Sequence, residues 1–211
     1  SFTSGGTDLT INQTLSTGGG SIAFNNTGDI VVAANLDSSG STAGSVSVSD
    51  AANSVNISAN ITAGGNMNFG DNSVTVSGSG RSLTNSGTQS ITFGGTLDGD
   101  SSAGDDAITI NSGSGGVTFA NNVGSTDSLE TLTVDSDGSV DFDGTVAVAG
   151  NIDIDGTSAS FDNTVSTTAG GTFTLTNSGT ATFVGAADLN FDGAFHQDGS
   201  GGVSTAGDIT T

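Results

Sequence analysis

The sequence of 211 residues contains no cysteine, proline, lysine, tryptophan or tyrosine. Without cysteine it cannot form a disulfide framework. Arg81 is its only strongly basic residue, against 22 acidic residues and a net charge of −21. Binding to nucleic acid or to anionic lipid needs clustered Lys or Arg, so we expect neither kind of partner. No apolar run approaches the length of a membrane span, so direct membrane insertion is not expected either.

The residues that are abundant favour short β-strands. Glycine occurs 35 times, and Ser, Thr, Asn and Asp supply most of the remaining polar positions. Apolar residues occur in short alternating bursts, as in Ser21–Phe24, Ser73–Val76 and Gly150–Ile154. Alternation with a period of two predicts strands with one face buried. Apolar residues nowhere recur with helical spacing over three turns, so an all-β chain is predicted.

A weak repeat follows the phenylalanines. An apolar residue, any residue, Phe and then a turn pair recur at Phe24, Phe69, Phe93, Phe119, Phe142, Phe161 and Phe183, at intervals of 45, 24, 26, 23, 19 and 22 residues. The first interval is close to twice the others, as if one repeat between Val46 and Ile61 had lost its Phe. Phe191 also fits the motif but not the spacing.

A period near 22 residues, with two or three short strands per repeat, is typical of one coil of a β-solenoid. We therefore predict a single parallel β-helix over residues 1–211, with about nine coils of roughly 22 residues. At the strand spacing its length is about 40–45 Å. The strands are too short and the period too even for a β-sandwich.

Four segments carry a resemblance to known proteins: residues 18–36 (GGGSIAFNNTGDIVVAANL), 61–78 (ITAGGNMNFGDNSVTVSG), 124–156 and 170–183 (GGTFTLTNSGTATF). These repeats, rich in Gly, Asn and Thr and marked by a recurring Phe, resemble the repetitive passenger regions of filamentous-haemagglutinin-like and autotransporter adhesins of bacteria. The resemblance implies a right-handed parallel β-helix, export to the cell surface, and a role as spacer, adhesin or fibre. It implies no catalytic residues.

Paired aspartates are the candidate metal ligands. Asp135 and Asp137, Asp141 and Asp143, and Asp153 and Asp155 each alternate with one intervening residue, the spacing of side chains on one strand face. If such pairs stack in neighbouring coils, their charges repel, and a hard cation such as Ca²⁺ would relieve the repulsion. Calcium is therefore the candidate cofactor. The alternative is that turns separate the pairs and salt screens them. Asp98, Asp100, Asp105 and Asp106 also crowd one glycine-rich loop.

The sequence gives less support to other kinds of functional site. Asn151–Gly156, with Asp162 at the twelfth position, mimics an EF-hand calcium loop, but its flanks alternate as strands. His196 is the only histidine, so a transition-metal site or a Ser–His–acid triad is not expected. Threonine pairs such as Thr131 and Thr133 suggest an ice-binding array, but such pairs do not recur at the coil period.

We therefore expect a non-enzymatic, secreted structural or adhesive segment of a longer bacterial surface or filament protein. The expected partners are neighbouring copies or flanking repeats stacked end to end, and glycans or proteins of host, prey or cell surfaces. The alternatives are a carbohydrate-active β-helix enzyme, which needs only two carboxylates, and a calcium-binding or ice-binding β-solenoid module.

Overall fold

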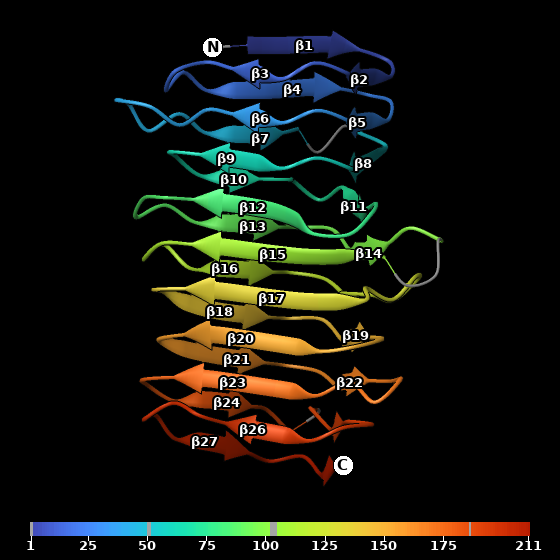
Figure 1. Cartoon of the computed structure of the whole chain (residues 1–211), viewed down its shortest axis with the longest axis vertical. Helices are drawn as coiled ribbons and strands as arrows, with labels where there is room; N and C mark the ends of the chain where they lie inside the picture. Colours follow the sequence, from blue (N-terminus) through green and yellow to red (C-terminus); the bar gives the residue numbers. More distant parts are fainter. Residues whose placement is uncertain (1, 50–51, 102–104, 186) are drawn as a thin grey trace.

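A computed structural model describes residues 2–49, 52–101, 105–185 and 187–211, and its regular elements are all β-strands. The strands pair in parallel and stack into a β-solenoid of about nine turns, roughly 22 residues apart. In Figure 1 the near strands run left and the far strands run right as the chain descends from N to C, which is a right-handed winding. The predicted architecture is confirmed. No described residue belongs to a helix that could cross a membrane.

The coils contribute strands to three faces, one strand to each face, except that the coil between β16 (Val117–Phe119) and β17 (Thr131–Ser136) has only the bridge residue Val123 on face B. Face A is a sheet of ten strands: β1 (Phe2–Gly6), β4 (Ile22–Asn26), β7 (Val46–Val48), β10 (Met67–Asn68), β13 (Ile91–Phe93), β16 (Val117–Phe119), β18 (Ser139–Phe142), β21 (Ser158–Phe161), β24 (Ala181–Phe183) and β27 (Val203–Thr205). Face C is a sheet of nine: β3 (Leu15–Ser16), β6 (Leu36–Asp37), β9 (Ile61–Ala63), β12 (Arg81–Asn85), β15 (Ala107–Ser112), β17 (Thr131–Ser136), β20 (Ile152–Gly156), β23 (Phe173–Asn177) and β26 (Phe195–Gln197).

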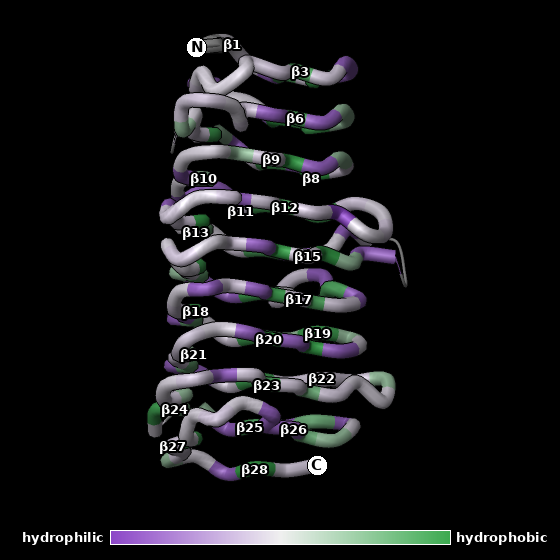
Figure 2. The backbone as a smooth tube through the Cα atoms, turned by 60° about the vertical axis from the view of Figure 1, so that its left-hand side comes forward, coloured by the Kyte–Doolittle hydropathy of each residue, from purple (hydrophilic) through white to green (hydrophobic). Residues whose placement is uncertain are grey.

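Face B connects the other two and consists of a five-stranded and a four-stranded sheet. Its strands are β2 (Leu9–Ile11), β5 (Ile30–Val32), β8 (Ser54–Ile57), β11 (Ser73–Val76), β14 (Leu97–Gly99), β19 (Val146–Val148), β22 (Val165–Thr167), β25 (Leu189–Asn190) and β28 (Ile209–Thr210). Val123 forms parallel bridges to both Leu97 and Val146, and so joins the two sheets. Figure 2 shows hydrophilic and hydrophobic residues following one another along the coils, as a one-sided core requires.

The phenylalanines of the repeat form one column inside face A. Register pairs Phe93 with Phe119, Phe119 with Phe142, Phe142 with Phe161 and Phe161 with Phe183. Neighbouring rings from Phe69 to Phe183 stack with centroids 4.5–5.1 Å apart and interplanar angles of 12° or less. Phe24 pairs with Val48, which is the repeat that had lost its Phe. Phe191 follows β25 on face B, so it was rightly set apart from the repeat.

Side-chain oxygens extend the ladder from each coil to the next. Asn60 lies just before β9, and its Oδ1 accepts the backbone N–H of Ser82 in the following coil at 3.0 Å. Asn35 does the same for Asn60 at 3.1 Å, and Asn151 for Thr172 at 2.9 Å. Five more residues at the start of a strand repeat the pattern: Asp8, Ser21, Asn66, Asn122 and Asp188. In each of these bonds the side chain accepts a backbone N–H of the following coil.

This pattern yields a testable prediction. Asn60→Ala removes the acceptor for Ser82 N–H and is expected to lower the free energy of unfolding by about 1 kcal/mol. Asn60→Asp retains an oxygen at the same position, as Asp8 and Asp188 do naturally, and is expected to cost less. Urea denaturation of the two variants measures the difference. An equal loss in both would show that the hydrogen bond is not the cause.

Candidate functional site

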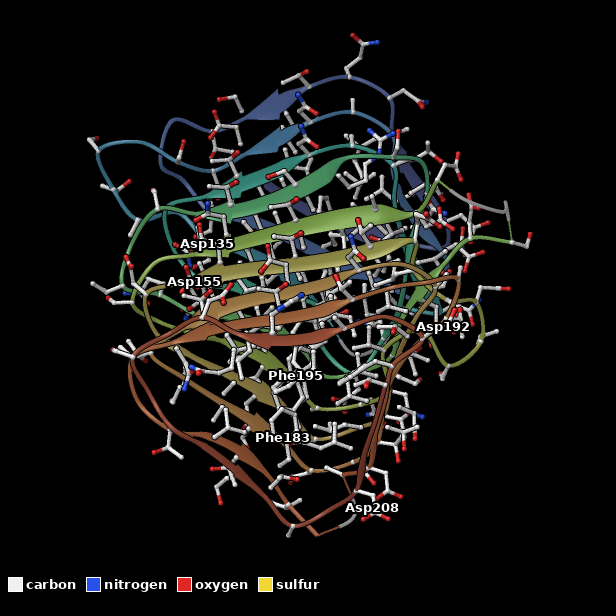
Figure 3. All side chains as sticks on the ribbon, turned by 60° about the horizontal axis from the view of Figure 1, so that its bottom comes forward. Asp135, Asp155, Phe183, Asp192, Phe195 and Asp208 are labelled. Carbon is white, nitrogen blue, oxygen red and sulfur yellow. The ribbon has the colours of Figure 1, made fainter. Side chains whose placement is uncertain are left out.

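Two carboxylates lie opposite each other on the outside of face C. Asp135 on β17 and Asp155 on β20 are in direct register, on strands about 4.8 Å apart. Asn111 precedes them in the same column and Thr176 follows them. Both aspartates are exposed, and Figure 3 shows them side by side on neighbouring strands. Like charges therefore do stack in neighbouring coils here, with Asp155 as the partner of Asp135.

The surroundings of Asp155 and Asp153 favour protonation. Partial burial raises the pKa of Asp155, and the charges of Asp135, Asp153 and Asp137 raise it further. Asp153 lies in the neighbouring outward column, between Thr133 and Thr174. Burial raises its pKa too, followed by the charges of Asp135 and Asp198. These carboxyls give up their protons less readily than an isolated aspartate does.

A shallow groove of about 220 Å³ runs between these side chains. Asp135, Asp153 and Asp155 line it together with Thr133, Val134 and Thr176. A second hollow of about 290 Å³ adjoins it at the end of the strands, where Asp137 and Asp155 meet Asn177 and Ser178. The arrangement offers oxygen ligands only, which suit a hard cation or a cationic group.

The other predicted ligands lie elsewhere. Asp141 is on β18 of face A, and Asp143 follows that strand at the corner toward face B. Burial raises the pKa of Asp141, helped by the charges of Asp143 and Asp162, while Ser160 opposes the shift by hydrogen bonding. The six predicted residues thus divide between two faces and do not make one site. Asp137 and Asp143 both lie beyond the ends of their strands, so neither pair projects from a single strand face as the spacing suggested.

A third cluster occupies the loop between β14 and β15. The carboxylates of Asp100, Asp105 and Asp106 place ligand atoms within 4.8 Å of one another. Asp106 is buried with 2% exposure, and its Oδ1 accepts Gly78 N–H at 3.3 Å. Burial and then the charge of Asp100 raise its pKa. The crowding was visible in the sequence, but the convergence of these three side chains was not. Residues 102–104 of this loop lie outside the described part of the chain.

Asp98, which the sequence grouped with this loop, instead lies on strand β14 and has a structural role. It is buried, and its Oδ1 accepts the backbone N–H of Thr126 from the next coil at 2.9 Å. Arg81, at the start of β12, donates from Nε to the carbonyl oxygen of Ser77 at 2.9 Å. Its register partner is the core residue Ile108, so Arg81 lies in a column of core residues at the point where strand β12 begins.

The structure also shows where the EF-hand-like segment, His196 and the threonine pairs lie. Residues 151–162 form β20 and β21 rather than an EF-hand loop, with Ile152 and Ile154 buried and Asp153 and Asp155 outward. His196 is exposed on β26. The threonine pairs do not recur at the coil period, as expected, because Thr131 and Thr133 lie opposite Ala107 and Thr109. Single threonines do share a column. Thr109 pairs with Thr133, and Thr174 continues their column after Asp153.

Comparison of the sequence and structure with known protein families, with characterised proteins and with solved structures gave no significant match. Function must therefore be argued from the geometry.

The raised pKa values predict how stability changes with pH. A group whose pKa is higher in the folded chain binds its proton more tightly there, so stability falls as pH rises from the unfolded value, 3.8, through the folded value. Asp106, Asp141, Asp153 and Asp155 all act in this direction. Asp29 acts in the other, because hydrogen bonds from Ser54 and Asn53 lower its pKa. At constant ionic strength we expect a higher Tm at pH 4 than at pH 7.5.

Asp155→Asn tests the source of that dependence. It removes one charge of the stacked pair and leaves Asp135 between two amide side chains, those of Asn111 and of the new residue. At pH 7.5 the variant is expected to be more stable by about 0.5 kcal/mol, since like charges directly opposite are destabilising. Its Tm should also change less with pH. A Tm that rises from pH 4 to pH 7.5 in the unsubstituted protein would contradict the argument.

Calcium binding stays a prediction, because acidic groups often lie together without an ion. If Ca²⁺ bridges carboxylates of neighbouring coils, Ca²⁺ should raise the Tm above that in chelator at equal ionic strength. Asp155→Asn and a separate Asp105→Asn variant would show which cluster holds the ion. Identical melting temperatures with Ca²⁺ and with chelator would exclude a structural role for the ion.

Proposed function

We propose that this chain is a stiff structural segment, a spacer or fibre subunit, of a secreted bacterial surface protein with an adhesive role. One observation supports this above the others: a single parallel ladder runs through every coil of face A from β1 to β27. A core column continues with it, and its rings are in stacking contact from Phe69 to Phe183. An uninterrupted core resists bending between coils in a way that a chain of linked domains does not.

The shape suits a spacer. The two ends of the chain lie at opposite ends of the stack in Figure 1, so tension applied through the termini acts along its axis. Nine coils at the strand spacing make a rod about 40–45 Å long. The net charge of −21 keeps such rods apart in solution. The bacterial and extracellular setting rests on the resemblance of the repeats to surface adhesins.

A further coil is the partner that best fits the C-terminal end. Val184, Val203 and Ile209 are the exposed large hydrophobic residues of the described chain, with exposures of 36%, 37% and 45%. All three lie in the last coils, where Phe195 is also half-buried. Figure 3 looks onto this end and shows Phe183 and Phe195 inside the ring of the final coils. Flanking repeats or another copy, stacked in parallel, would cover these side chains and pair the open strand edge.

Single-molecule extension tests the spacer function. A chain held by its two ends is expected to resist and then release coils in steps of about 75 Å, the extended length of one repeat. Smooth extension without force peaks would overturn the proposal. Turnover of a polysaccharide that is lost in Asp153→Asn would instead favour the carbohydrate-active alternative.

A further inference from the structure

Face A presents polar side chains in two outward columns. One column contains Asn68, Thr92, Thr118, Asp141, Ser160 and Thr182, whose register follows from the strand pairing. In the other column Ser139 pairs with Ser158, and Ser90 N–H is accepted by Asn66 of the preceding coil. The columns advance by one strand spacing, about 4.8 Å, per coil. The result is an array of mostly hydroxyl and amide groups, interrupted by Ala23 in the first column, by Gly116 in the second and by the carboxylate of Asp141.

The charges of the chain are distributed unequally around it. Asp141 is the only acidic side chain in the strands of face A among the described residues. Face C carries Asp37, Asp135, Asp153 and Asp155 in its strands. Many of the remaining carboxylates lie at the corners, before the strands of face B or in the loop after β14. A chain of net charge −21 thus has one broad face that is almost uncharged.

That face is hollowed around its single carboxylate. A depression of about 340 Å³ is lined by the polar residues Ser139, Asp141, Ser158, Ser160, Thr180 and Thr182, together with Val140 and Ala159. These residues come from β18, from β21 and from the start of β24, so the depression spans three coils. Asp141 is half-buried within it. Hydroxyl groups that can both donate and accept therefore surround one strong acceptor.

We propose that face A binds a linear, uncharged polysaccharide lying along the stack, with one of its sugars seated in the depression at Asp141. Sugar hydroxyls donate and accept hydrogen bonds, as do the Ser, Thr and Asn side chains of the two columns. A neutral polymer can cover this face without desolvating a row of carboxylates, which it could not do on face C. Contacts that repeat from coil to coil combine many weak hydrogen bonds, so the overall affinity for the polymer exceeds that of any single contact. The proposal deepens the adhesive part of the function and rests on it.

A matched pair of double variants tests the assignment. Thr92 and Thr118 are register partners on face A, and Thr62 and Thr84 are register partners on face C. All four are half-exposed and point outward. Thr92→Asp with Thr118→Asp, and Thr62→Asp with Thr84→Asp, add the same charge to different faces. Each protein is incubated with cellulose, chitin and cross-linked dextran, and with calcium-free pectate gel as the anionic comparison, at physiological salt. The bound fraction is measured.

The unsubstituted protein should be retained by at least one neutral polymer and not by pectate. Retention should fall at least fivefold in the face A variant and stay within twofold in the face C variant, with circular dichroism unchanged in both. Equal loss in the two variants, or no retention of the unsubstituted protein, would overturn the proposal. So would shaping of ice crystals without polysaccharide binding, which would assign the hydroxyl array to ice. Force measurements are independent of this result, so the spacer function can survive its failure.

Discussion

Replacing Phe119 by alanine is expected to lower the free energy of unfolding by about 3–5 kcal/mol. Phe119 is 1% exposed, and its ring lies 5.1 Å from that of Phe93 and 4.5 Å from that of Phe142. Alanine would leave a cavity in the middle of the stack and remove both ring contacts. The neighbouring coils cannot close the gap, because their spacing is fixed by the parallel hydrogen bonds. Chemical denaturation measures the loss.

Phe119→Leu is the matched control. Val48 occupies the same column between Phe24 and the coil of Phe69, so an aliphatic side chain can be accommodated there. We expect the leucine variant to lose less than half as much stability as the alanine variant. If Phe119→Ala lost less than about 1 kcal/mol, the Phe column would not be the main support of the core.

Gly124→Ala is expected to be comparably damaging, by about 3–5 kcal/mol. Gly124 has φ of +69°, which alanine adopts only with strain, and an added Cβ would stand 1.9 Å from the carbonyl oxygen of Ala147 in the next coil. Its N–H also donates to Leu97 O at 2.8 Å, so the backbone cannot move away without breaking the ladder. Either the coils separate locally or this hydrogen bond is lost.

Gly202→Ala provides the comparison for that variant. An added Cβ at Gly202 would have no other heavy atom within 4 Å, and the backbone of Gly202 does not lie in the left-handed region. Its Tm should remain within about 2 °C of the unsubstituted protein. A similar fall in Tm for both variants would mean that loss of glycine flexibility, rather than the clash between coils, sets the cost.

The path of the core could be predicted because its residues repeat at the coil period. A narrow interior accepts one large ring per coil at a given position, so the spacing of Phe93, Phe119, Phe142 and Phe161 was enough to align them. The long interval between Phe24 and Phe69 correctly indicated a coil without a ring. These positions are buried, where packing leaves little freedom in residue type.

The surface could not be predicted in the same way. Phe intervals vary from 19 to 26 residues, because the corners differ in length, and a shift of two residues exchanges one outward neighbour for another. The spacing therefore does not decide whether Asp153 or Asp155 lies opposite Asp135, and it does not show that Asp141 belongs to a different face. The meeting of Asp100 with Asp105 and Asp106 depends on the conformation of a loop. Local sequence does not fix such a conformation.

The side-chain acceptors that precede the strands have a consequence for how the molecule winds. The side chain of Asn35 accepts the backbone N–H of Asn60, and the side chain of Asn60 accepts that of Ser82. In both bonds the acceptor precedes the donor in the chain. A completed coil thus offers fixed docking points for the amides of the stretch that emerges after it. The earlier part of the polypeptide acts as a template for the later part, and assembly can follow the order of synthesis.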